Sequence, residues 1–219
     1  LTIKAGSIYV GAAAKIIGFC IKDAAAGGSY GGAVVFNGGN GPIEKCFISG
    51  CKTTGVLKPA FFKSYVTVTD CVCSNNAGGL SWCRASGCTI VRNTATSGAG
   101  GCGSCVLNDC EIVGNGIHGV TLANGTVRNC LIAGNKANNG GAGVYQTGGT
   151  MEFCTIVGNT SVNIKNSGIY LNGVSAVNRY NIIYANGKGI ESEPKCNLDF
   201  VKAQTFAKNI VLPATDGMD

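Results

Sequence analysis

The chain of 219 residues has little charge, few aromatic side chains and few prolines. Charged residues make up 13% of it and aromatic residues 7%, with four Pro and a single His. A hydrophobic fraction of 45% with so little charge excludes an intrinsically disordered chain. No apolar run approaches the roughly 18 residues that a membrane-spanning helix requires, so the sequence predicts no transmembrane segment.

The net charge of +6 is spread along the chain without a basic cluster. Proteins that bind nucleic acids usually concentrate positive charge on one face and add stacking aromatic side chains. We therefore expect no nucleic-acid partner. Glycine is abundant, at 35 residues, but it shows no three-residue period, which excludes collagen.

A cysteine-led hexad of the form C-x-I-x-x-N recurs through the chain. It is clearest as CTIVRN, CEIVGN, CLIAGN and CTIVGN, and the frame continues more loosely on both sides. The eight segments start at Cys20, Cys46, Cys71, Cys88, Cys110, Cys130, Cys154 and Asn181. These starts lie 17 to 27 residues apart, so the chain is a tandem repeat with insertions of variable length.

Each repeat consists of several very short segments in which apolar and polar residues alternate. Gly and Asn, which tolerate the backbone angles of tight turns, separate these segments. No stretch has apolar residues at helical spacing, and each frequent Gly would cost a helix about 1 kcal/mol. The sequence therefore predicts an all-β fold, a right-handed parallel β-helix of about eight coils over residues 1–190. A leucine-rich repeat is disfavoured because Ile, Val, Cys and Gly hold the repeated positions.

Alternation within the hexad predicts which side chains point into the β-helix. The Cys and the Ile two residues later share one face and should form inward columns spaced about 4.8 Å from coil to coil. The Asn three residues after the Ile should form a turn column, adopting the left-handed conformation and passing amide hydrogen bonds between coils. Its expected members are Asn76, Asn93, Asn115, Asn135, Asn159 and Asn186, with Cys51 and Ala25 in the same position of the early coils.

The thirteen cysteines admit three interpretations, which are packing, disulfides and metal binding. Seven of them start a hexad, Cys20 included, where a buried and reduced thiol would pack as a small hydrophobe. Disulfides between neighbouring coils remain open, because the spacing of adjacent strands falls within the range that a bridge tolerates. Cys102 and Cys105 form a lone CxxC without the second pair or the histidines of a zinc site. We therefore expect no metal ion and no cofactor.

Three segments carry a family likeness: GTVRNCLIAGN (125–135), GGAGVYQ (140–146) and CTIVGNTS (154–161). They resemble the right-handed parallel β-helix repeats of bacterial surface proteins. They are similar to the polymorphic outer-membrane protein repeats, although I-x-x-N stands where those repeats usually carry Phe. The resemblance implies a non-catalytic extracellular or cell-surface protein used for adhesion, display or structural assembly. Surface glycans and host or cell-surface proteins are the partners that it implies.

The alternative function is a carbohydrate-active polysaccharide lyase or glycoside hydrolase, since such enzymes share the β-helix. Hydrolysis needs two carboxylates about 5 to 9.5 Å apart. Asp109 and Glu111, on either side of Cys110, would face the same way in an ideal strand and are the strongest acidic candidates. His118, the only histidine, lies in a GIHG segment that resembles the GHG of polygalacturonases. All three are interpreted first as surface or loop residues, so the sequence predicts no catalytic residue.

The remaining expectations concern an outward charge column and the two ends of the chain. Arg128, Glu152 and Arg179 precede consecutive hexads by two residues and should form an outward column of alternating sign. After Asn186 the repeat fades, and residues 191–219 are expected to form a C-terminal capping or exit segment. Residues 1–10 show no comparable cap, so we expect them to continue a longer chain or to stack end to end on another copy.

Overall fold

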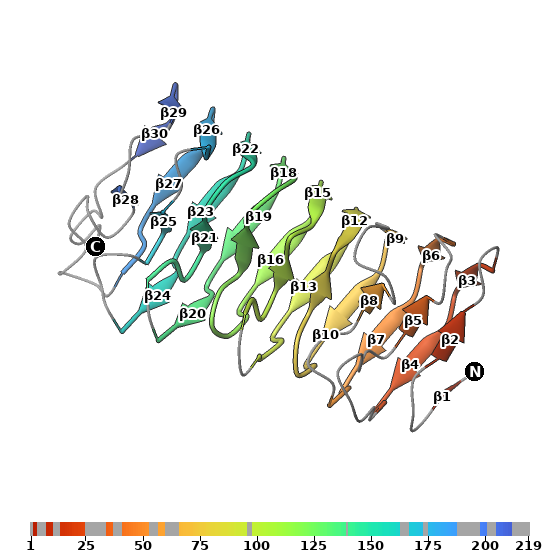
Figure 1. The fold of residues 1–219 in the computed structure, drawn as a ribbon. Coiled ribbons are helices and arrows are strands. Elements are labelled where there is room, and N and C mark those ends of the chain that lie inside the picture. The colour runs from red at the N-terminus through yellow and green to blue at the C-terminus, as the bar shows by residue number, and fades with distance from the viewer. Residues whose placement is uncertain are drawn as a thin grey trace, which may run out of the picture.

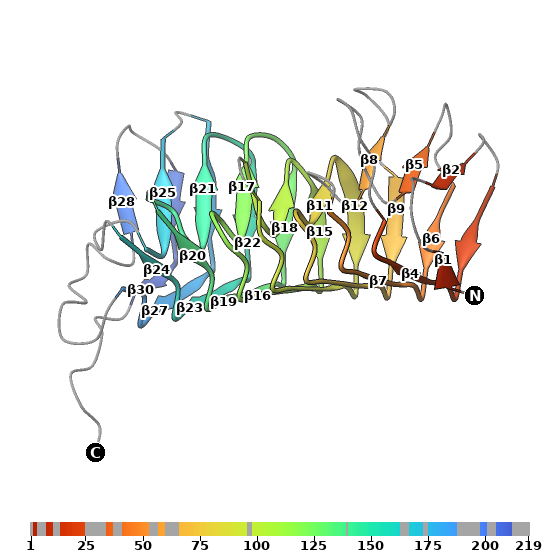
Figure 2. The same ribbon diagram turned by 90° about the horizontal axis from the view of Figure 1, so that it is seen from below.

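The computed structural model consists of short β-strands and turns that wind around one long axis (Figure 1). It describes residues 2–3, 8–10, 14–24, 34–36, 41–52, 57–59, 66–95, 98–138, 140–162, 167–172, 175–187, 198–200 and 205–211. These residues contain thirty strands and no helix. The coils stack one on another from the N-terminal end to the C-terminal end and give an elongated body, as Figure 2 shows from a second side.

Three long parallel sheets form the faces of this body, and a complete coil contributes one strand to each. The first sheet consists of β1 (Thr2–Ile3), β4 (Cys20–Lys22), β7 (Phe47–Ser49), β10 (Val72–Ser74), β13 (Thr89–Val91), β16 (Glu111–Val113), β19 (Leu131–Ala133), β23 (Thr155–Val157), β27 (Ile182–Tyr184) and β30 (Ile210–Val211). The second consists of β2 (Ile8–Val10), β5 (Val34–Phe36), β8 (Leu57–Pro59), β11 (Leu80–Ser81), β14 (Cys102–Gly103), β17 (Val120–Leu122), β21 (Val144–Gln146), β25 (Ile169–Leu171) and β28 (Leu198–Phe200). The third consists of β3 (Ile16–Ile17), β6 (Ile43–Glu44), β9 (Val66–Thr69), β12 (Cys83–Ser86), β15 (Val106–Asn108), β18 (Thr126–Arg128), β22 (Thr150–Glu152), β26 (Val177–Arg179) and β29 (Thr205–Ala207). A small fourth sheet pairs β20 (Lys136–Ala137) with β24 (Thr160–Ser161).

Neighbouring coils pair in register, so equivalent residues of successive repeats lie beside one another along the axis. Thr89, Glu111, Leu131 and Thr155, for example, are successive partners in the first sheet. The eight expected coils correspond to β4, β7, β10, β13, β16, β19, β23 and β27, and β1 and β30 add one strand at each end of this sheet. β28, β29 and β30 fall within residues 191–219, and each extends one of the three long sheets.

Columns of apolar side chains fill the interior, as the alternation predicts. The Ile of the hexad is fully buried at Ile48, Ile90, Ile112, Ile132 and Ile156, and the fully buried Cys73 takes its place in the coil of β10. The adjacent column of buried cysteines is Cys46, Cys71, Cys88, Cys110, Cys130 and Cys154. Each of these six thiols donates a hydrogen bond to the carbonyl two residues before it, at 3.1–3.3 Å. The cysteine therefore fills space and also satisfies a backbone carbonyl at the corner of the coil.

Cys20 departs from the predicted column. It pairs with Phe47 and is partly exposed, whereas the fully buried Ile21 pairs with Ile48. The carbonyl of Phe19 accepts a hydrogen bond from the backbone N–H of Phe47 in the next coil. The carbonyl of Cys46 accepts the equivalent bond one coil later, so Phe19 is the structural equivalent of Cys46. The prediction that Cys20 points inward is wrong by one residue, because burial of Ile21 fixes the alternation of this strand and turns Cys20 outward.

The predicted asparagine column is a ladder of buried amides. Its members are Asn76, Asn93, Asn115, Asn135, Asn159 and Asn186, each at most 1% exposed. Each Nδ2 of the first five donates to Oδ1 of the asparagine in the next coil, at 2.8–3.1 Å. Cys51 precedes them in the column, and its backbone N–H donates to Oδ1 of Asn76 at 3.0 Å. The predicted passage of amide hydrogen bonds between coils is therefore confirmed.

Two details of this column differ from the prediction. The left-handed conformation lies one residue earlier, at exposed positions such as Asn75, Arg92 and Gly114. The exposed residue makes the turn, which leaves the following Asn free to direct its amide into the interior. In the early coil Ala24 holds the equivalent position. Its carbonyl accepts a hydrogen bond from the backbone N–H of Lys52, as the carbonyl of Cys51 does from that of Ala77 one coil later. Ala25, which was expected there, lies outside the described residues.

A second corner, between the third and first sheets, positions the candidate site. One residue of each coil adopts a positive φ here, directly before the hexad cysteine or its structural equivalent, which is Phe19 in the coil of Cys20. We call these residues the outer corner column: Gly18, Lys45, Asp70, Gly87, Asp109, Asn129, Phe153, Tyr180 and Lys208. Their side chains differ greatly in size from coil to coil, unlike those of the inner columns.

Candidate functional site

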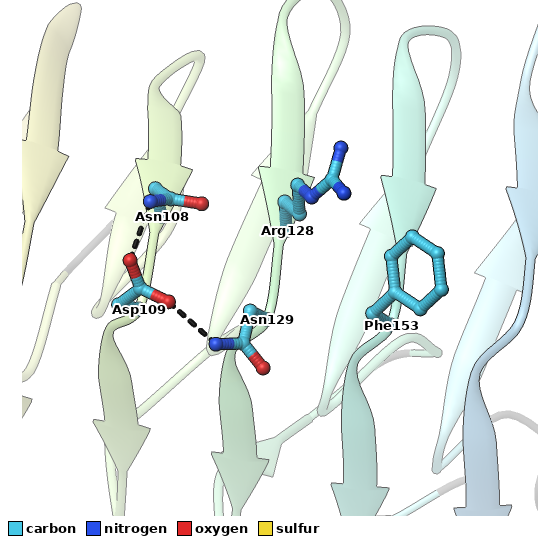
Figure 3. Close-up of a pocket in the computed structure, with 5 residues that line it drawn as sticks. All are labelled: Asn108, Asp109, Arg128, Asn129 and Phe153. Carbon is cyan, nitrogen blue, oxygen red and sulfur yellow. Dashed lines mark hydrogen bonds between the residues drawn. The ribbon is translucent and has the colours of Figure 1, made fainter.

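The outer corner column borders a hollow of about 420 Å³ on the surface. Its lining residues are Asn108, Asp109, Arg128, Asn129 and Phe153, which come from three successive coils (Figure 3). Asn108 and Arg128 end β15 and β18, whereas Asp109, Asn129 and Phe153 are corner residues. The hollow exists because the short side chains of Asp109 and Asn129 stand next to the large ring of Phe153.

A carboxylate held by two amides forms the polar part of the hollow. Nδ2 of Asn108 donates to one oxygen of Asp109, and Nδ2 of Asn129 donates to the other (Figure 3). All three residues are exposed to solvent. Because Asn129 belongs to the next coil, the carboxylate joins two coils, and the three groups present both donors and acceptors to a ligand.

An exposed aromatic ring forms the apolar part of the hollow. Phe153 is 46% exposed and stacks on Tyr180 of the next coil, with ring centroids 5.0 Å apart and planes 4° apart. The guanidinium carbon of Arg128 lies 4.9 Å from the centroid of the Phe153 ring, a cation–π contact. Phe153 also has a φ of 55°, a conformation that bulky residues rarely adopt. These neighbours fix the ring in place at the edge of the hollow.

A charge column runs beside the ring. Glu152 forms ion pairs with Arg128, at 3.8 Å, and with Arg179. The three residues are in-register partners in consecutive strands of the third sheet, so the predicted column of alternating charge is confirmed. Glu152 is only 8% exposed, whereas about half of each arginine side chain is exposed. The two arginines therefore flank the carboxylate of Glu152 and cover it from solvent.

The structure separates the two acidic candidates. Asp109 lines the hollow, but its positive φ of 54° places it in the corner between β15 and β16. Glu111 begins β16 on the first sheet, is exposed and is not one of the lining residues. The expectation that these two carboxylates face the same way in one strand is therefore wrong, because the corner of the coil falls between them.

His118 lies just before β17, an interior strand of the second sheet, and belongs to a different part of the coil. Its Nδ1 is 2.8 Å from the carbonyl oxygen of Gly141, and its ring centroid is 5.3 Å from that of Tyr145. Tyr145 in turn lies 5.4 Å from Tyr170. Burial lowers the pKa of His118, and the hydrogen bond with Gly141 partly opposes this shift. His118 is thus part of an aromatic stack on the second sheet and does not line the hollow.

No group of three or more His, Cys, Asp or Glu side chains is placed to hold a metal ion in the part of the chain that the structure describes. Cys102 and Cys105 are both buried and are separated by the corner at Ser104, whose φ is 51°. A search of the described ranges for a helix long and apolar enough to cross a membrane finds none. Cys196 lies outside the described residues.

Sequence reasoning identifies Asp109 but misses Asn108, Asn129 and Phe153. The signal that could have found two of them is their position, since Asn129 and Phe153 directly precede hexad cysteines, as Asp109 does. Aligning the repeats on the cysteine brings these three residues into one column. The alignment also shows the abrupt change from small polar to aromatic side chains that produces the hollow.

Comparison with known proteins identifies the fold. A family model described as a right-handed beta helix region matches residues 18–103. The chain is a right-handed parallel β-helix. No curated protein and no solved structure matches it. The residues that line the hollow, within 108–153, lie C-terminal to the matched segment.

Proposed function

We propose that this β-helix is a non-catalytic extracellular or cell-surface protein that adheres to glycans through the hollow at the outer corner column. The observation that carries the proposal is the exposed ring of Phe153 beside the hydrogen-bonding groups of Asn108, Asp109 and Asn129. A sugar ring has a C–H face that stacks on an aromatic ring and a rim of hydroxyl groups that bind amides and carboxylates. The hollow offers both kinds of contact within one site.

The rigidity of the site supports the same function. Stacking on Tyr180 holds Phe153, and two amides from adjacent coils hold the carboxylate of Asp109. Groups that are already ordered lose little conformational freedom on binding, so more of the interaction free energy contributes to affinity. A shallow rigid site of this kind suits repeated low-affinity contacts with a polymer or a surface, where linked binding events raise the overall avidity.

The alternative function, a polysaccharide lyase or glycoside hydrolase, has less support in this hollow. Hydrolysis requires a second carboxylate about 5 to 9.5 Å from the first. Of the five lining residues, only Asp109 is acidic. Each of its oxygens accepts a hydrogen bond from an amide, and such bonds to the charged form stabilise the carboxylate and make it a weaker base. Binding therefore agrees with the geometry better than catalysis does.

We extend the proposal to display or structural assembly through end-to-end stacking of copies. β1 and β30 are the outermost strands of the ten-stranded first sheet. The outer edge of a terminal strand is a template for pairing with another chain. Electron micrographs of the purified protein at increasing concentration would show filaments if copies stack, and single short rods at every concentration would refute this part.

Glycan binding is tested by a Phe153→Ala variant screened against a glycan array and titrated with the best ligand by calorimetry. We expect a loss of affinity of about tenfold or more, which corresponds to about 1.4 kcal/mol. Tyr184→Ala is the matched control, because Tyr184 is similarly exposed, at 37%, but lies on the first sheet. Full affinity in Phe153→Ala, or no glycan bound by the unchanged protein, would refute the proposal.

The enzymatic alternative is tested separately with the same ligand. The protein is incubated with the bound glycan, and new reducing ends and unsaturated products are measured over time. We expect neither product. Turnover that an Asp109→Asn substitution abolishes would establish the lyase or hydrolase instead, because that change keeps the shape of the side chain and removes its charge.

A further inference from the structure

A pair of cysteines outside the six-member column lies in direct contact. Cys83 begins β12, and Cys105 immediately precedes β15 in the next coil. The following residues, Arg84 and Val106, are in-register partners, so the two cysteines occupy equivalent positions one strand apart. Their sulfur atoms are 3.4 Å apart, and the residues are 0% and 2% exposed.

The pair lies directly beneath the surface at the corner between the second and third sheets. The residues before the two cysteines, Trp82 and Ser104, turn the chain with φ of 54° and 51°. Trp82 is 36% exposed, and Ser104 is partly exposed. This corner covers the two cysteines on one side, so a local opening of the turn is the route by which a small oxidant would reach them.

The geometry of adjacent strands is compatible with a bridge. Neighbouring parallel strands lie about 4.8 Å apart, within the range of Cα separations that disulfides span. The sulfur atoms must approach from 3.4 Å to about 2.05 Å, which rotation of the two side chains provides. The thiol of Cys105 donates to the carbonyl of Gly103 at 3.3 Å, and this hydrogen bond is lost on oxidation.

We propose that Cys83 and Cys105 are a redox modification site, which closes to an inter-coil disulfide under oxidising conditions. With hydrogen peroxide as oxidant, one thiol gives up its proton and its sulfur attacks the peroxide; the O–O bond breaks, the sulfur becomes a sulfenic acid, and the departing hydroxide takes the proton and leaves as water. The second thiol then gives up its proton and attacks that sulfur; the S–S bond forms, the S–O bond breaks, and the departing hydroxide takes this proton and leaves as a second water. The sum is two thiols and one peroxide giving one disulfide and two waters. This inference is independent of glycan binding.

The test is peptide mapping of the full chain after treatment with hydrogen peroxide. Remaining thiols are alkylated, the protein is digested, and the fragments are weighed. We expect a linked pair of peptides that contains Cys83 and Cys105 and lacks the mass of two hydrogen atoms. Trp82 is the only tryptophan of the chain and is adjacent to Cys83, so its fluorescence should fall through quenching by the disulfide and recover with dithiothreitol.

Two variants make the assignment specific. Cys105→Ala should remove both the linked peptide and the reversible change in fluorescence. Cys88→Ala is the matched control from the six-cysteine column, and it should leave both signals unchanged. The proposal is refuted if both cysteines of the unchanged protein remain fully alkylated, if either is linked mainly to another cysteine, or if both end as sulfinic acids. Mapping the unchanged protein decides the matter even if a variant fails to fold.

Discussion

The buried asparagine ladder predicts a large and specific loss of stability when one of its rungs is removed. Asn135 lies in the middle of the ladder and is 0% exposed. Its Oδ1 accepts hydrogen bonds from the backbone N–H of Asn115, at 2.9 Å, and from Nδ2 of Asn115, at 3.1 Å. Its Nδ2 donates to the carbonyl of Ile112, at 3.0 Å, and to Oδ1 of Asn159, at 2.9 Å. An Asn135→Ala substitution removes all four.

The magnitude follows from the group left without a partner. The backbone N–H of Asn115 is then buried without its partner. The carbonyl of Ile112 keeps its place in the ladder of β16 and β19, and Oδ1 of Asn159 still accepts from the backbone N–H of Asn135. A buried polar group without a partner costs about 1–3 kcal/mol, which is a substantial part of the about 5–15 kcal/mol by which domains are stable.

Urea unfolding followed by circular dichroism measures this loss. Asn138→Ala is the matched control, because Asn138 lies in the same coil and is exposed, and its substitution should change stability by less than about 0.5 kcal/mol. In a stack of repeats, a damaged coil can also uncouple its neighbours and split the transition into two. A loss below about 1 kcal/mol in a single unchanged transition would show that the ladder hydrogen bonds do not stabilise the coil.

The remaining predictions concern two glycines and one histidine. A methyl group at Gly119 would lie 2.7 Å from Nδ2 of Asn135, so Gly119→Ala should cost about 2 kcal/mol or more, by disturbing the ladder. Gly134→Ala meets nothing within 4 Å and should cost only about 1–2 kcal/mol, through its positive φ; equal unfolding midpoints for the two variants would contradict this reasoning. Because burial lowers the pKa of His118, the unfolded chain binds more protons below about pH 6.5, and stability should fall as the pH falls from about 7.5 to about 5. His118→Asn should weaken that dependence, and an identical pH profile for the variant would refute the argument.

The inner columns could be predicted from the sequence because each position in the hexad has one physical requirement. Ile112 and Cys110 must be apolar to fill the core, and Asn115 must supply an amide to both neighbouring coils. Such requirements repeat in every coil, so the pattern is visible without coordinates. Where the pattern fades, one residue decides the alternation, and for Cys20 that residue was its buried neighbour Ile21.

The conformation of the corners was harder to predict, because sequence preference and structural role point to different residues. Asparagine readily adopts the left-handed conformation, which favoured Asn115 and its equivalents for the turn. In the structure Gly114 makes the turn, with a φ of 65°, and Asn115 is reserved for the interior. At the other corner even Phe153 adopts a positive φ, so residue type alone does not mark these positions.

The hollow could not be predicted from any single repeat, because it depends on a difference between repeats. Asp109 drew attention as half of an acidic pair, yet its role comes from Asn129 and Phe153, which are 20 and 44 residues further along the chain. Only the in-register stacking of coils brings these residues together. The inner columns must be nearly constant for the β-helix to form, so differences that create a binding site are confined to outer columns such as this corner. A binding site in such a fold is therefore expected where the residue type in an outer column changes between neighbouring coils, as it does from Asn129 to Phe153.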